Sequence, residues 1–140
     1  MVNPRRVKFT DLELEYLSDK VLRATVTLEW KEETYRGTAE TEWIEHQELI
    51  CCAKAACLAL EAVTAKSKTE FEYLQCEPVT AVGQVLAVAA VAIGSAVSHQ
   101  YMVGASQIKD SPGDSAVRAV LCATNRLQVG EYREQLPIAY

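Results

Sequence analysis

Hydrophobic and polar residues alternate along the first third of the chain, and this alternation predicts three β-strands. The strictest run spans residues 21–31, where polar residues separate an apolar set formed by Leu22, Ala24, Val26, Leu28 and Trp30. Residues 7–16 and 34–43 follow the same pattern, with predicted inward positions at Leu12, Leu14, Tyr16, Tyr35, Gly37, Ala39, Thr41 and Trp43. Polar turns at 18–20 and 31–33 join these runs, so we predict an antiparallel meander with one buried face and one solvated face.

A helix is predicted over residues 45–65, because the apolar spacing there changes to about 3.6 residues. The positions with this spacing are Leu49, Ile50, Ala53, Ala56, Cys57, Leu60 and Val63, and Lys54 and Glu61 lie on the opposite side.

The same order of elements then returns in the second half. We predict strands over residues 70–77, 85–93 and 100–109, with Pro78 ending the first of them. A helix follows from Ser111 to Arg126. Ser111 is suited to be its N-cap, Pro112 would occupy the first helical position, and Asp114 would meet the helix dipole.

Two short sequence matches support an internal repeat. Gly37-Thr-Ala matches Gly104-Ala-Ser at an offset of 67, and the helical stretch beginning at Ala53 matches the one beginning at Val117 at an offset of 64. We therefore predict an α+β fold made of a tandem βββα repeat, with antiparallel sheet backed by two helices. It would form a single domain over residues 1–140, with halves at 7–65 and 70–127 and a tail at 128–140. The alternative is a chance resemblance between two ordinary meanders.

Composition and charge narrow the range of partners. A chain of 140 residues with 49% apolar residues and a net charge of -5 is typical of a globular domain. The acidic balance argues against nucleic acid, since the only local basic cluster, Arg5, Arg6 and Lys8, lies at the N-terminus. The apolar run at 81–97 contains Gly83, Gln84 and Gly94, so we interpret it as a buried strand and expect no membrane partner.

Five cysteines form an odd set in a chain that opens without an apolar signal region. We therefore expect a reduced, cytoplasmic protein. Cys52 and Cys57 lack CxxC spacing, and His46 and His99 lie in unrelated segments, so no metal or other cofactor is expected.

The second strand of the second half is apolar on both faces and needs a cover beyond its own helix. We assign one face to an interface between subunits, formed by Val85, Ala87, Ala89, Val91 and Ile93, and predict a homodimer. The alternative is that residues 128–140 fold over this face.

The start of the last helix is the one place where polar groups converge. No nucleophile with a base and no phosphate-binding loop is present, so no catalytic residue is assigned. The candidate ligand-binding residues are Gly104, Asp110, Ser111, Gly113, Asp114 and Arg118. They could hold a small carboxylate or amino acid, or Ser111 and Asp114 could simply cap the helix. We predict a non-catalytic regulatory or ligand-binding module. A protein-interaction scaffold is the second reading and an enzyme the third.

The duplicated βββα order, a glycine late in the third strand and the helix start Asp110-Ser-Pro-Gly-Asp-Ser-Ala resemble the C-terminal regulatory domain of isopropylmalate synthases. The residues that would match that family's loop are Gly104, Asp110, Pro112, Gly113, Asp114 and Ala116. The resemblance implies a dimer that binds an end-product amino acid near these helix starts and inhibits a separate catalytic barrel, which this chain does not contain.

Overall fold

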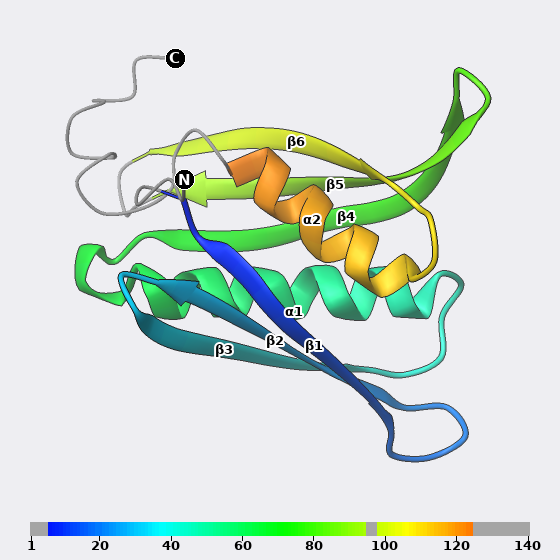
Figure 1. Ribbon diagram of the computed structural model, residues 1–140, viewed down its shortest axis with the longest axis horizontal. Helices are drawn as coiled ribbons and strands as arrows, with labels where there is room; N and C mark the ends of the chain where they lie inside the picture. The colour runs from blue at the N-terminus through cyan, green and yellow to red at the C-terminus, as the bar shows by residue number, and fades with distance from the viewer. Residues whose placement is uncertain (1–5, 95–97, 125–140) are drawn as a thin grey trace.

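Two βββα units follow one another in the computed structural model, which describes residues 6–94 and 98–124 (Figure 1). The first comprises β1 (Lys8–Tyr16), β2 (Leu22–Trp30), β3 (Glu33–Thr41) and α1 (Gln47–Val63). A 3-10 turn (Ala65–Ser67) leads to β4 (Glu70–Ala81), β5 (Gln84–Gly94), β6 (His99–Gln107) and α2 (Pro112–Thr124). The predicted α+β repeat is confirmed. The predicted helix end at Asn125 and Arg126 and the tail at 128–140 lie outside the described residues.

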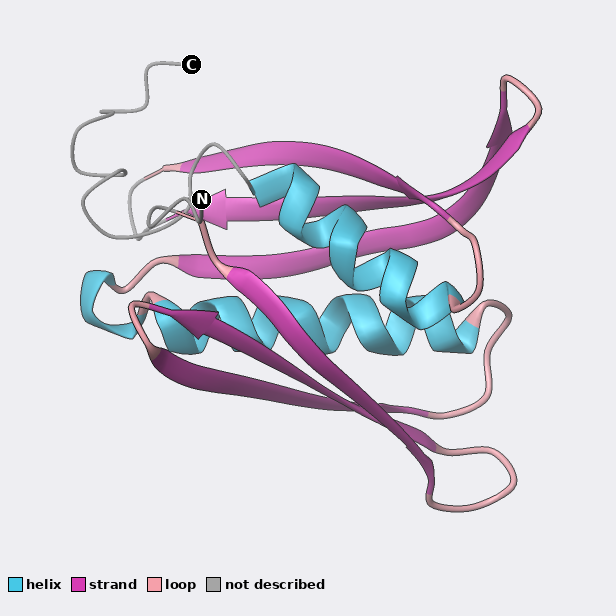
Figure 2. Ribbon diagram, in the orientation of Figure 1, coloured by secondary structure: helices cyan, strands magenta, loops and turns pink. Residues whose placement is uncertain are grey.

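The strands form two separate antiparallel sheets, ordered β1-β2-β3 and β4-β5-β6 (Figure 2). Helix α1 packs against β2 and β3 and also along β4, whereas α2 packs against β5, β6 and α1. The two units therefore share one core, which lies around the two helices.

Strand β2 supplies much of the first unit's core, as its alternation predicts. Its four inward side chains, Leu22, Ala24, Val26 and Leu28, are completely buried. Burial of these apolar side chains stabilises the folded chain by about 0.8 kcal/mol for each CH₂ group that is removed from water.

Three aromatic and aliphatic residues predicted to point inward are exposed instead. Leu14 and Tyr16 lie on β1, an edge strand, where the β1–β2 hairpin bends away from both helices (Figure 1). Trp43 is 68% exposed because β3 ends at Thr41, before reaching it. Alternation thus identified the strands, but did not show how far the helices cover each one.

Pro78 does not end its strand, contrary to the prediction. It lies within β4 opposite Ala87, and the strand continues to Ala81. Proline is tolerated because β4 is an edge strand, where a missing N–H costs no ladder bond on the open side. Val82 and Gly83 then form a tight turn with φ of 51° and 73°, so the apolar run at 81–97 contains a hairpin turn before β5.

The proposed interface residues on β5 require a correction. Ala87, Ala89, Val91 and Ile93 are at most 2% exposed, since α2 covers this face within the monomer, and only Val85 at the strand's end is exposed. A second subunit cannot reach the four buried residues. The opposite face carries Leu86, Val88 and Ala90, which are partly exposed, and Ala92, which is 3% exposed.

The two units repeat each other beyond their element order. Both edge strands carry a register shift, between Phe9 and Asp11 in β1 and between Tyr73 and Gln75 in β4. A cation on each helix lies over an aromatic ring on the first strand of the other unit: Arg118 is 5.2 Å from the Phe9 centroid, and Lys54 is 5.5 Å from that of Tyr73. Arg118 and Lys54 are 64 residues apart, as are Tyr73 and Phe9, which is the offset of the helical sequence match.

One side chain of α1, that of Glu48, accepts a hydrogen bond from the backbone at the start of α2. The Gly113 N–H donates to Oε2 of Glu48 at 2.8 Å, so a carboxylate from the first unit meets the positive end of the second unit's helix.

Replacing Glu48 by alanine should therefore lower the free energy of unfolding by about 1–2 kcal/mol, since it removes a charged cap. Urea unfolding followed by circular dichroism measures this change. The matched control is Glu45→Ala, whose carboxylate is largely exposed and should be neutral within about 0.5 kcal/mol. Equal stability of the two variants would contradict this role for Glu48.

Candidate functional site

A polar groove of about 810 Å³ lies between the first strand of one unit and the helix of the other. Strand β1 contributes one wall through Phe9, Thr10, Asp11 and Leu12. The other wall is formed by the end of β6, the loop after it and the first turns of α2, with Ser106, Gln107, Lys109, Asp110, Ser111, Asp114, Ser115 and Arg118.

Four of the six predicted ligand-binding residues line this groove: Asp110, Ser111, Asp114 and Arg118. The structure gives Gly104 and Gly113 other roles. Gly104 is buried against α2, where a Cβ atom would lie 2.8 Å from Cα of Ala123 and overlap the Ala119 carbonyl. Gly113 is buried beside Cys52, and its N–H is taken by Glu48.

The N–H groups at the start of α2 have partners within the protein. Ser111 Oγ accepts from the Asp114 N–H at 3.2 Å, and the Ser111 carbonyl accepts from the Ser115 N–H at 3.1 Å. The Ser115 hydroxyl donates to the Gln107 carbonyl at 2.9 Å, which ties the helix to β6. Ser111 is thus an N-cap, and the helix start is not an open anion site, so any ligand would be held by side chains in the groove.

Those side chains carry charges of both signs. Arg118 Nε donates to Oδ2 of Asp114 at 2.8 Å, one turn earlier on the helix, and the guanidinium also lies over the Phe9 ring. Both members of the pair are partly exposed, so the pair itself contributes little to stability. Lys109, Asp11 and Asp110 also line the groove, so a cationic group and an anionic group could both be bound there.

The wall formed by β1 was not predicted from the sequence. Thr10 and Asp11 sit about a hundred residues before Asp110 in the chain, and no local pattern links them. The nearest signal is Phe9, since the repeat aligns it with Tyr73 and aligns Arg118 with Lys54.

The equivalent junction between α1 and β4 forms a second groove of about 560 Å³. Lys54 and Tyr73 replace Arg118 and Phe9 there, but four glutamates surround them: Glu40, Glu61, Glu70 and Glu72. Glu61 also accepts a hydrogen bond from the Phe71 N–H at 3.0 Å, within the protein. The second groove is therefore more acidic and less suited to a carboxylate, which makes it an internal control.

Four buried thiols belong to helix α1 and strand β4. Cys51, Cys52, Cys57 and Cys76 are buried and unpaired, whereas Cys122 is exposed. Burial, with the nearby Glu61 and Glu77 carboxylates, raises the pKa of the Cys57 and Cys76 thiols to about 12, and burial also raises the pKa of Cys51 and Cys52. These four thiols are protonated at neutral pH and do not act as nucleophiles there.

Residues 6–94 and 98–124 contain no group of three or more histidine, cysteine, aspartate or glutamate side chains that could hold a metal ion. No helix in that part of the chain has the length and apolar character needed to cross a bilayer.

Comparison of the sequence with protein-family models and with curated proteins finds no match.

Proposed function

We propose that this chain is a non-catalytic module that binds a small carboxylate or amino acid in the groove between β1 and α2. The observation that carries the proposal is the convergence of Asp110, Ser111, Asp114 and Arg118 with Asp11 of the other unit in one open groove. Pockets that bind small molecules combine a shaped concavity with a few charged or polar groups that fix orientation.

The groove suits a zwitterion better than a simple anion. The guanidinium of Arg118 offers several N–H donors, and the bond to Asp114 uses Nε, so its outer edge can donate to a ligand carboxylate. Asp11 and Asp110 can accept from a ligand ammonium group. The resemblance to isopropylmalate synthase regulatory domains favours the same class, and amino acids are therefore the first ligands to test.

A ligand bound here would link the two units of the fold, because β1 belongs to the first and α2 to the second. Binding in the groove would hold β1 against α2 and change the stability of this contact. That coupling is what a regulatory module requires, since a ligand shifts an equilibrium only through differential binding.

The test is a thermal-shift screen of the full chain with the proteinogenic amino acids and small dicarboxylates. A ligand at about 100 times its Kd stabilises by about 2.7 kcal/mol, which should raise the Tm by several degrees. Arg118→Ala should abolish the shift, whereas Lys54→Ala, the equivalent change in the acidic groove, should preserve it. Absence of any shift, or a shift that both variants retain, would contradict the proposal.

A scaffold function is the second candidate, and the exposed apolar face of the second sheet favours it. A scaffold would form a complex with another protein in a pull-down and show no thermal shift with any small ligand.

A further inference from the structure

The outer face of the second sheet is apolar along its central strand and on the β6 side, whereas its β4 side carries acidic residues. Leu86, Val88, Ala90 and Ala92 form the centre on β5, and Tyr101, Val103 and Ala105 flank them on β6. Tyr101 and Val103 are 75% and 67% exposed, and Leu74 and Val79 on β4 are also exposed. Within the described residues neither helix covers this face, because both pack on the inner sides of the sheets. A continuous apolar sheet face of this kind marks an interaction surface.

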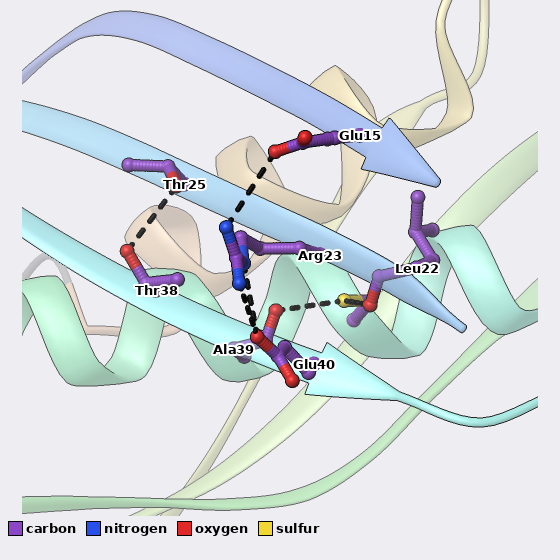
Figure 3. Close-up of polar contacts among 8 residues, drawn as sticks. Glu15, Leu22, Arg23, Thr25, Thr38, Ala39 and Glu40 are labelled. Atoms are coloured by element: carbon purple, nitrogen blue, oxygen red, sulfur yellow. Dashed lines mark hydrogen bonds and ion pairs between the residues drawn. The ribbon is translucent and has the colours of Figure 1, made fainter. Parts of the chain in front are cut away.

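The first sheet provides the comparison, since its outer face occupies the same place in the repeat. The positions on β2 that correspond to Leu86, Val88 and Ala90 are Arg23, Thr25 and Thr27. Arg23 pairs with Glu40 at 2.9 Å and approaches Glu15 at 3.6 Å, and the hydroxyls of Thr25 and Thr38 are 3.2 Å apart (Figure 3). The outer face of the first sheet therefore carries polar cross-strand pairs, whereas the second sheet has Leu86 in place of Arg23 and has Val88 and Ala105 in place of Thr25 and Thr38.

The charges on the apolar face lie along one edge and have one sign. Glu70, Glu72 and Glu77 lie on β4, opposite Gly94, Ala92 and Val88. The outward positions of β6 from Tyr101 to Gln107 carry no charged side chain. If β4 of one copy lay over β4 of another, these acidic rows would face each other, which is unfavourable. If β4 lay over β6, each acidic row would face uncharged side chains.

The register makes this second arrangement self-complementary. Glu72 and Tyr101 both pair with Ala92, so they lie at the same level on opposite edges of the sheet. A two-fold axis parallel to β5, between two sheets about 10 Å apart, brings Tyr101 of one copy over Glu72 of the other. The phenolic O–H can then donate to the carboxylate at the rim.

We propose that a second copy of this chain covers the outer face of β4-β5-β6, with β4 of each copy over β6 of the other. Three strands at a spacing of about 4.8 Å and a length of about 35 Å give about 500 Å² for each copy. The total of about 1,000 Å² is at the lower limit for a specific interface, so the dimer should dissociate on dilution. This inference does not depend on the ligand groove, which lies on the far side of α2 from the outer face.

Sedimentation equilibrium of the full chain over a range of concentrations tests the proposal. The expected result is a mass that rises from 15.5 kDa toward twice that value. Val103→Glu should weaken association at least tenfold, and the exposed position means that the monomer should still fold. Thr38→Glu makes the same charge change on the outer face of the first sheet and should leave association unchanged. A wild-type mass of 15.5 kDa at every concentration, or equal weakening by both variants, would overturn the proposal.

The orientation of the two copies is tested by comparing a positive and a negative charge at residue 103. With β4 over β6, Val103→Lys faces the acidic row and should associate more tightly than Val103→Glu by severalfold. With β6 over β6, each variant would face its own like charge, and the two would weaken association equally. Equal weakening would overturn the proposed orientation.

Discussion

Replacing Gly104 by alanine is expected to lower the free energy of unfolding by about 3 kcal/mol or more. The added Cβ atom would overlap the backbone of α2 at the Ala119 carbonyl and the Ala123 nitrogen, and it would lie 2.8 Å from Cα of Ala123. Backbone atoms of a packed helix cannot rotate aside as a flexible side chain can. The helix must move away from β6, and the core between them must open.

Urea unfolding of the purified variant measures this loss of stability. Two further substitutions test whether the close approach of the helix is its cause. Gly37→Ala should cost a similar amount, because Gly37 contacts Ala55 and Ala59 of α1 as Gly104 contacts α2. Gly83→Ala is the control: its site is open, with φ of +73°, so only backbone strain of about 1 kcal/mol is expected. Equal losses at Gly83 and Gly104 would show that helix approach is not what these glycines provide.

Stability should fall steeply as the pH rises above about 9, because the buried thiols stay protonated in the folded chain. Burial raises the pKa of Cys57 and Cys76 to about 12, whereas a thiol in the unfolded chain ionises near its ordinary pKa. The stabilisation is complete below the unfolded pKa and is lost as the pH rises toward the folded pKa. Each such thiol should cost about 1.4 kcal/mol per pH unit in this window, or about 2 kcal/mol by pH 10.5.

The measurement is the free energy of unfolding at pH 8 and at pH 10.5. Cys57→Ala should reduce the difference between the two values by about 2 kcal/mol relative to the unsubstituted chain, since one of the shifted thiols is absent. Cys122→Ser, at an exposed site, should leave the difference unchanged. A difference that Cys57→Ala does not alter would contradict the contribution of that thiol.

Most of the fold could be predicted because its signals are local. The alternation in β2, the helical spacing from Leu49 to Val63 and the cap at Ser111 each identified an element before any packing was known. The sequence match between Gly37 and Gly104 also has a structural cause, because both residues allow a helix backbone to approach the third strand of its unit.

The errors arise where packing decides between locally equal possibilities. Both faces of β5 are apolar, so alternation could not show which of them α2 covers. The repeat contained the answer: Gly37 pairs with the inward Val26, and Gly104 pairs with Ala89, which places Ala89 inward as well. Periodicity places Leu14, Tyr16 and Trp43 inward, because it does not reveal where a supporting helix stops.

Only part of the candidate site could be predicted from the sequence, because local patterns group neighbouring residues but do not report packing between the units. Asp110, Ser111, Asp114 and Arg118 lie within nine residues and share a helix start, so local reasoning grouped them. Asp11 and the rest of the β1 wall reach the groove only through the packing of one unit on the other. No pattern in a single sequence reports that contact.

The most direct test of the proposed function is a titration of the ¹⁵N-labelled full chain, followed by amide chemical shifts, with the best amino acid or dicarboxylate from the thermal-shift screen. Binding in the groove predicts saturable shifts that converge on two distant segments, Thr10–Leu12 of β1 and Asp110–Arg118 of the loop and α2, with no comparable change around Lys54. Shifts confined to the acidic groove, or no saturable shift at all, would contradict it.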